Sequence, residues 1–476
     1  MRDHDLEVNV LKNKQLIQST NPDWKSYSEN ALDPDTPIGS IDRMIFDQTS
    51  KAPTVLQVLR HILWVNKIRI INNLFYFYNC EKGCFFRIDE NNERICINQF
   101  FSPRIQQLIS TSCAKEAISR LKSIPHIQMD LDELDSDSNL INVANGVLNI
   151  MEGKVLPKSH KYKFSYCLNI DYYRINAKWE LCPTFQSFCK TSLRGDNKKI
   201  ELLLQILGYL WSKKWGAKVA FFFVGEANSG KSVMLELIKY VWHYENVSTI
   251  PLHKLGDRFN IASLSNKALN ICAEMKSTAI KNIDIFKAIT SGDTLCGEYK
   301  GKDIFSFTCR TKLLFSGNMM PSIAEAEASK AFLNRICMLS FTKEIPKEQQ
   351  NPNLFEQLKE ERNVIFSLSI ESLQKLVDNN FDFIMPQETV AYLHDYAAQQ
   401  NHIDDFIENC CQKEANVKIP SAAIYERYLD YCSENFIKPY PLCQFSEYFR
   451  RIAKVDPIHA RFDGDLRRGF SGITLK

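Results

Sequence analysis

One short segment constrains the fold of this chain more than any other. Residues 225–232 read Gly-Glu-Ala-Asn-Ser-Gly-Lys-Ser and fit the pattern Gly-x-x-x-x-Gly-Lys-[Ser/Thr] at every position. The apolar residues 220–224 come directly before this segment, and an amphipathic run begins at Ser232. A strand, a glycine loop and a helix in this order predict an α/β fold of the P-loop NTPase type.

The residue types in this loop suit the binding of phosphate. Glycines let backbone N–H groups turn inward toward phosphate oxygens. Lys231 would reach the β- and γ-phosphates of ATP, and the Ser232 hydroxyl would hold Mg²⁺. Because the chain has only 17 glycines in 476 residues, two glycines in this register carry more information than usual. The predicted nucleotide-binding residues are Gly225, Glu226, Ala227, Asn228, Ser229, Gly230, Lys231 and Ser232.

Polar residues near later apolar runs extend the predicted catalytic site. Glu274 follows residues 268–273, at a strand end where an acid would act on metal or water. Asn318 follows the next such run and suits orientation of that water. Either residue alone could be a strand-end cap, but their order after the loop favours catalysis. Arg335 is either a surface arginine or an arginine finger that reaches a γ-phosphate held by a neighbouring subunit.

The composition excludes several classes of protein. Hydrophobic residues make up 45% of the chain and charged residues 24%, which excludes a disordered chain and a collagen-like fibre. The net charge is only +3, so we expect any nucleic-acid site to be local. The 15 cysteines include no Cys-x-x-Cys pair, which favours reduced, buried thiols over a zinc site. No signal peptide and no apolar run of about 18 residues is found, so a cytoplasmic location is expected.

Changes in residue pattern along the chain predict four segments. Within the second of them, residues 103–124 read as one helix that ends before Pro125. The segments are residues 1–50, polar and mobile; 51–195, an α+β N-terminal domain; 196–385, an ATPase domain; and 386–476, a C-terminal DNA-binding domain.

An acidic stretch mimics the metal motif of a primase. Residues 127–132 read Ile-Gln-Met-Asp-Leu-Asp, three residues followed by Asp-x-Asp. A primase site needs a substantial domain with further acidic and basic partners, and only about 125 residues precede this stretch. The favoured interpretation is a solvated linker before the turn at Asn145-Gly146.

Four stretches carry a family resemblance. They are Asn228-Ser229-Gly230-Lys231-Ser232; Arg258-Phe259 with Leu264, Lys267, Ile271 and Glu274; Phe286-Lys287 with Thr290-Ser291-Gly292-Asp293 and Tyr299-Lys300; and Leu313-Leu314-Phe315-Ser316-Gly317-Asn318 with Pro321 and Arg335. Together they resemble the superfamily 3 helicases, and more closely the primase-helicase family of satellite phages, plasmids and poxviruses. The likeness extends over roughly residues 55–476. The chain is also similar to Rep-type replication initiators of phage-satellite pathogenicity islands.

The resemblance implies a ring, commonly a hexamer, of AAA+-like ATPase domains that translocates on single-stranded DNA, usually 3′ to 5′. ATP and Mg²⁺ would sit between subunits, in the cytoplasm of a bacterial host. Lys231 and Ser232 would bind nucleotide and metal, Glu274 would act on metal and water, Asn318 would be the sensor, and Arg335 would be the finger from the next subunit. Ala273 departs from the family, because many P-loop motors have Asp there.

A glycine between two lysines predicts a hairpin tip between Cys296 and Phe307. The resemblance implies that this hairpin lines the ring channel, with Lys300 and Lys302 on the DNA backbone and Tyr299 as hairpin support or base stacker. The alternative is a solvated turn.

The C-terminal tail is basic, and its pattern predicts a winged helix. Residues 438–476 hold eight basic and four acidic residues, a net of +4, while residues 1–437 carry −1. A helix that ends in Arg450 and Arg451, followed by a hairpin that carries Arg467 and Arg468, would contact phosphates in a salt-sensitive way. The alternative is a winged helix that only packs subunits.

Three functions remain open from the sequence. The first is a DNA-translocating helicase. The second is an origin-binding initiator that uses ATP only to assemble and does not separate strands. The third is a signalling P-loop ATPase whose activity ignores single-stranded DNA.

Overall fold

The computed structural model describes most of the chain. Residues 1–50, which were predicted to be mobile, lie outside the described residues, except for residues 31–36. The described residues are 31–36, 52–275, 280, 283–301, 303–321, 323, 331–341, 344–400, 402–435, 439–462 and 464–476.

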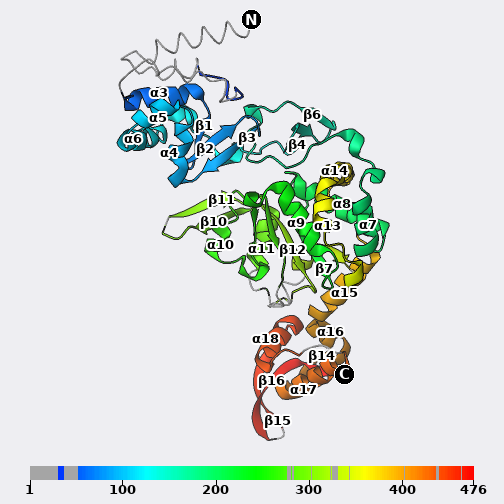
Figure 1. Ribbon diagram of the computed structural model, residues 1–476. Coiled ribbons are helices and arrows are strands. Elements are labelled where there is room, and N and C mark those ends of the chain that lie inside the picture. Colours follow the sequence, from blue (N-terminus) through cyan, green and yellow to red (C-terminus); the bar gives the residue numbers. More distant parts are fainter. Residues whose placement is uncertain are drawn as a thin grey trace.

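A five-stranded parallel sheet forms the centre of the molecule, in the strand order β13-β7-β12-β9-β8 (Figure 1). Phe221 and Phe223 of β7 pack into one hydrophobic core, while Phe222 and Val224 pack into another. A strand buried on both faces reads as a continuous apolar run. This sheet confirms the predicted α/β class. Its strands are β7 (Ala220–Gly225), β8 (Val247–Ser248), β9 (Leu269–Cys272), β12 (Lys312–Gly317) and β13 (Ile336–Phe341).

Helices cover both faces of this sheet. The core on one face contains residues of α8 (Asn197–Trp211), α9 (Lys231–Trp242), α13 (Leu354–Glu360) and α14 (Arg362–Asp378). The core on the other face contains residues of α10 (Arg258–Ala262) and α11 (Ile283–Ser291), beside a hairpin of β10 (Thr294–Glu298) and β11 (Ile304–Thr308).

The N-terminal unit has its own core of helices packed on a three-stranded antiparallel sheet. The expected single helix over residues 103–124 is wrong, because the structure has two helices there. Ile109 is extended (ψ 108°), and the Ser110 side chain accepts from the Cys113 N–H and caps a new helix. The elements are α3 (Val55–Val65), β1 (Ile68–Ile71), β2 (Leu74–Asn79), β3 (Cys84–Ile88), α4 (Glu93–Asn98), α5 (Pro103–Leu108) and α6 (Thr111–Leu121).

Residues 31–36 form a turn that is tied to this unit. The buried Lys67 amine donates to the backbone oxygens of Pro34 and Thr36, the latter at 2.6 Å. The Asp35 carboxylate accepts from the Tyr78 hydroxyl at 2.5 Å and from the His160 backbone N–H at 2.9 Å. These bonds hold the pKa of Asp35 below its usual value, although burial opposes them. At these residues the expected loose lead segment is therefore an anchored turn.

The packing divides the chain differently from the expected boundary between residues 195 and 196. Residues 140–193 share one hydrophobic core with α8 and α14, so they pack as part of the unit built on the parallel sheet. We call it the ATPase unit after the domain that the sequence predicts there. At the start of α7, Cys182 and Phe185 are buried in this core. The elements are β4 (Leu140–Val143), β5 (Gly146–Asn149), β6 (Lys154–Leu156) and α7 (Pro183–Ser192).

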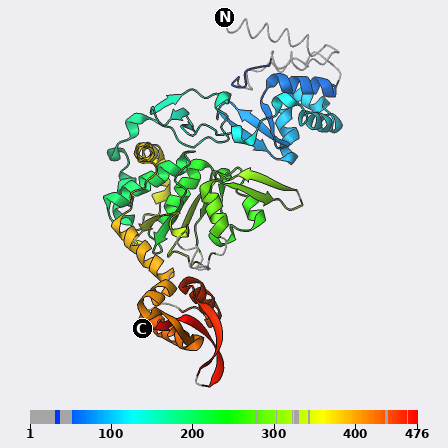
Figure 2. The same cartoon turned by 180° about the vertical axis from the view of Figure 1, so that it is seen from behind.

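Helix α15 (Gln387–Gln400) connects the ATPase unit to the C-terminal unit, as both Figure 1 and Figure 2 show. Tyr396 of α15 belongs to an ATPase core, and the separate C-terminal core begins at Ile403. The boundary therefore falls near residue 401 rather than at Pro386. The unit contains α16 (His402–Cys410), β14 (Cys411–Pro420), α17 (Ser421–Glu434), α18 (Leu442–Ala453), β15 (Asp456–Phe462) and β16 (Asp465–Leu475), with strand order β14-β16-β15.

Short 3-10 helices connect the larger elements. They are η3 (Glu90–Asn92), η4 (Pro125–Ile127), η5 (Leu131–Glu133), η6 (His160–Tyr162), η7 (Arg174–Asn176), η8 (Trp179–Leu181), η9 (Tyr244–Asn246), η10 (Leu252–Lys254) and η11 (Lys347–Gln349).

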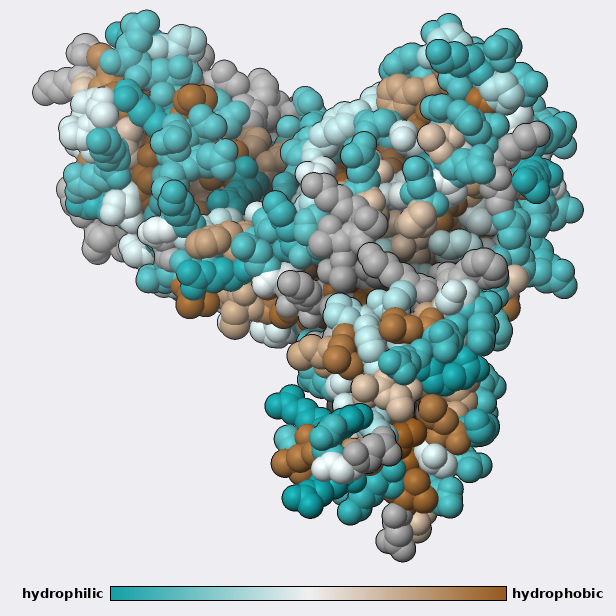
Figure 3. Space-filling view, turned by 90° about the horizontal axis from the view of Figure 1, so that it is seen from below, coloured by the Kyte–Doolittle hydropathy of each residue, from teal (hydrophilic) through white to brown (hydrophobic). Residues whose placement is uncertain are grey.

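Apolar side chains are scattered among hydrophilic ones on the face drawn in Figure 3. Across the described part of the chain, no helix combines the length and the apolar character that crossing a bilayer requires.

The contact between α8 and α14 generates a stability prediction. A Cβ at Gly208 would lie 2.3 Å from the Ser369 backbone oxygen. Overpacking costs about 1–3 kcal/mol, more than the roughly 1 kcal/mol that alanine gains over glycine in a helix. We expect Gly208→Ala to lower the free energy of unfolding by about 1–2 kcal/mol in urea unfolding. Glu201→Ala, a partly exposed change on the same helix, is the control, and a Gly208→Ala protein as stable as wild type would contradict the packing described.

Candidate functional site

The glycine loop lies at the end of β7, and neighbouring backbone and side-chain atoms leave no room for a Cβ at either of its glycines. A Cβ at Gly225 would lie 1.6 Å from the Phe341 backbone oxygen of the neighbouring strand β13. A Cβ at Gly230, whose φ is +95°, would lie 2.5 Å from Ser192 Oγ. Ser192 is 1% exposed and its hydroxyl has no hydrogen-bond partner among the described residues. Only glycine fits at these two positions, and the loop is held closely against β13 and α7.

Lys231 is folded back onto the loop. Its Nζ donates to the backbone oxygens of Gly225 at 2.8 Å and Glu226 at 2.5 Å, and to Ser229 Oγ at 3.1 Å. Burial lowers the pKa of the Lys231 amine, and the charge of Glu226 partly opposes this effect. The amine therefore lies within the loop in contact with neutral oxygens, and an anion in the loop would be a stronger partner for it.

The segment after β13 closes over the loop. Asn228 has φ +54°, and its Nδ2 donates to Glu344 Oε1 at 3.1 Å. The Ile345 N–H donates to the Asn228 backbone oxygen at 3.2 Å, and the Glu344 N–H donates to Glu226 Oε2 at 3.2 Å. Asn228 thus has a structural role that links the loop to residues 344–345, which the sequence pattern alone did not indicate.

The strand order brings Glu274 and Asn318 to the same edge of the sheet as the loop. β12 lies between β7 and β9, with Phe315 opposite both Phe222 and Cys272. Parallel strands end at the same edge, so residues 225–232, Glu274 and Asn318 follow three neighbouring strand ends. Glu274 and Asn318 are both exposed there, as are Ser232 and Ala273.

Arg335 lies at the opposite edge of the sheet. It precedes β13, and its backbone oxygen accepts from the Ala220 N–H at the start of β7. The six residues of β13 span about 20 Å, so the structure does not bring Arg335 to the loop of its own chain. Its NH1 donates to the Ala331 backbone oxygen at 3.3 Å, and its buried Nε has no hydrogen-bond partner among the described residues.

The β10–β11 hairpin is present where the sequence predicts it. The Tyr299 hydroxyl donates to the Ala262 backbone oxygen at 3.1 Å, and its ring stacks on Phe305 with 5.1 Å between centroids. Tyr299 therefore supports the hairpin and is not free to stack on a base. Lys300 is exposed at the tip, and Lys302 lies outside the described residues. Lys287, whose Nζ is 2.8 Å from Asp284 Oδ1, forms an ion pair within α11.

Two of the four C-terminal arginines that were predicted to contact DNA line one cavity. Arg450 on α18 and Arg468 on β16 line a cavity of about 340 Å³, together with His459. Arg467 is 2.8 Å from Asp465 on the same hairpin and does not line this cavity. The side chain of Arg451 lies outside the described residues.

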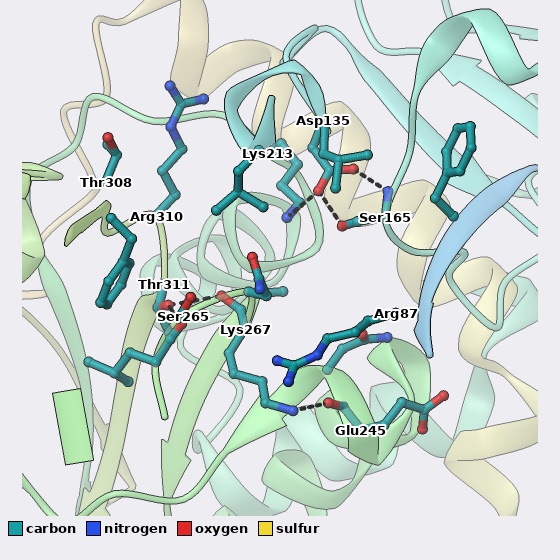
Figure 4. Close-up of a pocket in the computed structure, with 18 of the residues that line it drawn as sticks. Arg87, Asp135, Ser165, Lys213, Glu245, Ser265, Lys267, Thr308, Arg310 and Thr311 are labelled. Atoms are coloured by element: carbon teal, nitrogen blue, oxygen red, sulfur yellow. Dashed lines mark hydrogen bonds and ion pairs between the residues drawn. The ribbon is translucent and has the colours of Figure 1, made fainter. Parts of the chain in front are cut away.

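A second, larger cavity of about 600 Å³ lies between the N-terminal and ATPase units, and the sequence did not indicate it (Figure 4). Arg87 and Asp135 come from one side, and Lys213, Lys267 and Arg310 come from the other. Lys213 Nζ is 3.0 Å from Asp135 Oδ2, an ion pair across the units. Because the lining residues are scattered over more than 200 positions, no local pattern marks them.

Asp130 and Asp132 of the primase-like stretch do not form a metal cluster. Among the described residues, one group has the geometry to hold a metal ion, and it is Asp33, Asp35 and His160. Asp35 already accepts hydrogen bonds from Tyr78 and His160. Asp130 instead forms a capping box with Glu133 at η5.

Models of known protein families match both ends of the chain and part of the region between them. The model "D5 N terminal like" matches residues 57–193, and "Poxvirus D5 protein-like" matches residues 398–463. Between them, "Family of unknown function (DUF5906)" matches residues 223–335, a span that runs from β7 through the loop to Arg335. The two D5-type matches support a similarity to the phage- and poxvirus-type primase-helicases. This confirms the family resemblance, while similarity to initiators of phage-satellite islands stays a prediction.

Individual relatives are distant. "Putative helicase L207/L206" of Acanthamoeba polyphaga mimivirus is 23% identical over 227 residues, which cover 46% of this chain and 23% of that protein. The matched region is thus less than a quarter of that relative's length. Two apo structures of the NrS-1 C terminal region are 12% identical with a TM-score of 0.48, and cover 88% and 87% of this chain and 100% and 98% of theirs.

A buried lysine at the larger cavity generates a pH prediction. Lys312 Nζ donates to the backbone oxygens of Tyr209 and Ser212, the latter at 2.8 Å. Burial lowers its pKa well below the ordinary lysine value, and Lys213 adds to this effect. At pH values between the pKa of Lys312 in the folded chain and its pKa in the unfolded chain, the unfolded chain therefore binds more protons. In that pH range this group makes the free energy of unfolding rise with pH.

In Lys312→Met this pH-dependent contribution is lost. We expect the difference in free energy of unfolding between variant and wild type to change as the pH rises toward the ordinary lysine pKa of about 10.4, by at most about 1.4 kcal/mol per pH unit, with wild type gaining stability. Urea unfolding at several pH values measures it. The exposed Lys254→Met serves as the control. Parallel pH curves for Lys312→Met and wild type would contradict the buried amine.

Proposed function

We propose that the chain is an ATP-dependent DNA helicase that acts in replication. It assembles as a ring, commonly of six copies, and moves on single-stranded DNA from 3′ to 5′. The observation that carries this proposal is the convergence of residues 225–232, Glu274 and Asn318 on one edge of the parallel sheet. The D5-type family matches at both ends of the chain favour a helicase over other P-loop proteins.

The residues at this edge fit ATP and Mg²⁺ as cofactors. The loop admits no side chain at Gly225 or Gly230, and the Lys231 amine contacts only neutral oxygens of the loop. Ser232 and Glu274 offer the oxygen ligands that Mg²⁺ prefers. The bound metal would neutralise phosphate charge. Lys231 would hold the β- and γ-phosphates, Glu274 would also polarise the attacking water, and Asn318 would orient it.

The strand order supports a superfamily 3 core. Numbered within the sheet, the order β13-β7-β12-β9-β8 is 5-1-4-3-2, which inserts the Asn318 strand between the loop strand and the Glu274 strand. A polar side chain at the end of β12 can then contact groups held by either neighbour. In the absence of a second acid at Ala273, Ser232 and Glu274 would hold the metal with water.

The position of Arg335 supports a site shared between subunits. Arg335 is too far from the loop of its own chain to contact a nucleotide bound there. It could reach only a nucleotide that is bound to a second copy of the chain. An arginine finger supplied from a neighbour stabilises charge on the γ-phosphate in the transition state. A ring places each Arg335 against the loop of the next copy, so assembly would be a condition of hydrolysis.

Two regions are the proposed DNA contacts. Lys300, at the exposed tip of a hairpin that Tyr299 braces, would grip the backbone of single-stranded DNA. The C-terminal order of helix, strand, two helices and two strands supports a winged helix. Arg450 and Arg468, on α18 and on the wing strand β16, would contact phosphates of duplex DNA with help from Arg451 and Arg467.

ATPase and fork-unwinding assays, with and without single-stranded DNA, test the proposed function. Wild type should hydrolyse ATP faster with single-stranded DNA and should separate a forked duplex. Lys231→Ala should lose both activities by about 100-fold or more, since removal of a preorganised cation of this kind typically costs about 10²–10³. Lys300→Ala should keep basal ATPase but lose DNA stimulation and unwinding, and Lys254→Ala is the matched lysine control.

Each outcome of these assays has a distinct meaning. Intact forks with an ATPase that ignores single-stranded DNA would contradict the helicase. ATP-dependent oligomers without unwinding would indicate an assembly factor. Normal unwinding by Lys300→Ala would show that the hairpin is not the DNA contact.

Mixed rings test the shared site. Arg335→Ala subunits have an intact loop but no finger, whereas Lys231→Ala subunits have the finger but a defective loop. If Arg335 acts on the next subunit, a mixture of the two inactive variants should recover ATPase activity at the interfaces that pair a wild-type loop with a wild-type finger. For random mixing in equal amounts, about one quarter of the interfaces would qualify. Complete absence of recovery in rings shown by mass measurement to be mixed would contradict the proposed role.

A further inference from the structure

A segment that follows β13 borders the glycine loop from outside the loop's own sequence pattern. Within the sheet, Phe341 lies opposite Gly225, and the Phe341 backbone oxygen would be 1.6 Å from a Cβ built at Gly225. Beyond the strand, residues 344–345 make three hydrogen bonds with residues 226–228. The end of β13 and the segment after it therefore contact the first half of the loop.

One of these three bonds depends on a side chain of the segment. Asn228 Nδ2 donates to Glu344 Oε1 at 3.1 Å. The other two bonds have backbone donors. The Glu344 N–H donates to Glu226 Oε2 at 3.2 Å, and the Ile345 N–H donates to the Asn228 backbone oxygen at 3.2 Å. Asn228 is thus held at its backbone and at its side chain, and the Glu344 carboxylate is the group that holds the side chain.

The shape of the loop depends on the backbone conformation of Asn228. Its φ is +54°, in the left-handed region, and Gly230 has φ +95°. Left-handed residues in a loop of this kind turn successive backbone N–H groups toward one side, where they can receive an anion. Asparagine tolerates this region better than most residues that have a side chain, but the region is still sparsely populated. Bonds that hold Asn228 in this conformation therefore help to keep the loop in the shape that receives a phosphate.

The same segment supports the residues on which the Lys231 amine rests. Lys231 Nζ donates to the backbone oxygens of Gly225 at 2.8 Å and Glu226 at 2.5 Å. Gly225 lies against the backbone of Phe341, and the Glu226 carboxylate accepts from the Glu344 N–H. Glu344 is thus connected to the Lys231 amine through a second residue of the loop.

We propose that Glu344 is a positioning residue that holds the glycine loop in its phosphate-binding shape through Asn228. The proposal rests on the proposed function, because it concerns ATP at the same loop. The bond between the two side chains needs no nucleotide atom, so it orders the loop before binding and removes that cost from the binding step. Lys231, Glu274 and Asn318 stay in place without it. Glu344 therefore contributes to the affinity for ATP and not to kcat.

Nucleotide binding and steady-state ATPase kinetics of the full-length chain test the proposal. The binding probe is the non-hydrolysable analogue mant-AMPPNP, followed by its fluorescence. Glu344→Ala should bind it about three- to tenfold more weakly and raise KM for ATP by a similar factor, which is the usual effect of one lost hydrogen bond. Its kcat should stay within about twofold of wild type. Glu344→Gln removes the charge but keeps an oxygen that accepts from Asn228, so it should restore the affinity of wild type.

Glu348→Ala is the matched control, because it removes an exposed glutamate from η11, just beyond the segment. It should keep the affinity and KM of wild type. Wild-type or tighter binding by Glu344→Ala would overturn the positioning role, and so would binding by Glu344→Gln that is as weak as that of Glu344→Ala. In these cases the proposed function stands, provided that wild type binds the probe and Lys231→Ala does not. If wild type binds no probe, the proposed function itself fails and the positioning role fails with it.

An exchange of donor and acceptor tests the bond itself. Asn228→Asp keeps a residue type that tolerates the left-handed region, but it places a carboxylate against the Glu344 carboxylate and should weaken binding of mant-AMPPNP. In Asn228→Asp/Glu344→Gln the amide donates to the carboxylate, so the bond forms in the reverse direction. This double variant should bind at least about threefold more tightly than Asn228→Asp, beyond any effect of Glu344→Gln in wild type. Equal affinities of Asn228→Asp and the double variant would overturn the proposal.

Discussion

The parallel pairing of β12 with both β7 and β9 is the constraint on which the rest of the structure depends. With β12 in the middle, three strand ends meet at the carboxyl edge of the sheet, and they bring residues 225–232, Glu274 and Asn318 together. Both faces of the sheet must be covered, and α8, α9 and α14 on one side and α10 and α11 on the other provide this cover. The same pairing sends Arg335 and the interdomain cavity to the amino edge. One sheet thus separates the edge proposed to bind nucleotide from the edge that carries Arg335 and the cavity.

Much of this core could be predicted because its signals are local. The glycine loop is a contiguous pattern, and β7 and α9 follow from the runs on either side of it. The hairpin at β10–β11 follows from a glycine between two lysines. Glu274 and Asn318 could be placed at strand ends, but their adjacency depends on the strand order, which no local pattern contains.

The parts that were missed depend on long-range packing. Residues 140–193 look like a continuation of the N-terminal domain in sequence, yet they share the ATPase core. The break between α5 and α6 rests on a single serine cap at Ser110, which the apolar periodicity on either side conceals. Residues 31–36 read as a loose polar turn because their anchor, the buried Lys67, is about 30 residues away. The interdomain cavity is the extreme case, since Arg87 and Arg310 are 223 positions apart in the chain.

The central claim is that nucleotide binds at residues 225–232 of one copy and is completed by Arg335 of the next. A cryo-electron microscopy structure of the full-length chain with Mg²⁺, a non-hydrolysable ATP analogue and oligothymidylate tests it most directly. The account predicts a ring with phosphates against the Lys231 amine, Glu274 and Asn318 facing the γ-phosphate, and a guanidinium of Arg335 from the adjacent copy in contact with it. A nucleotide bound away from the loop, or a ring in which Arg335 faces no nucleotide, would contradict the account.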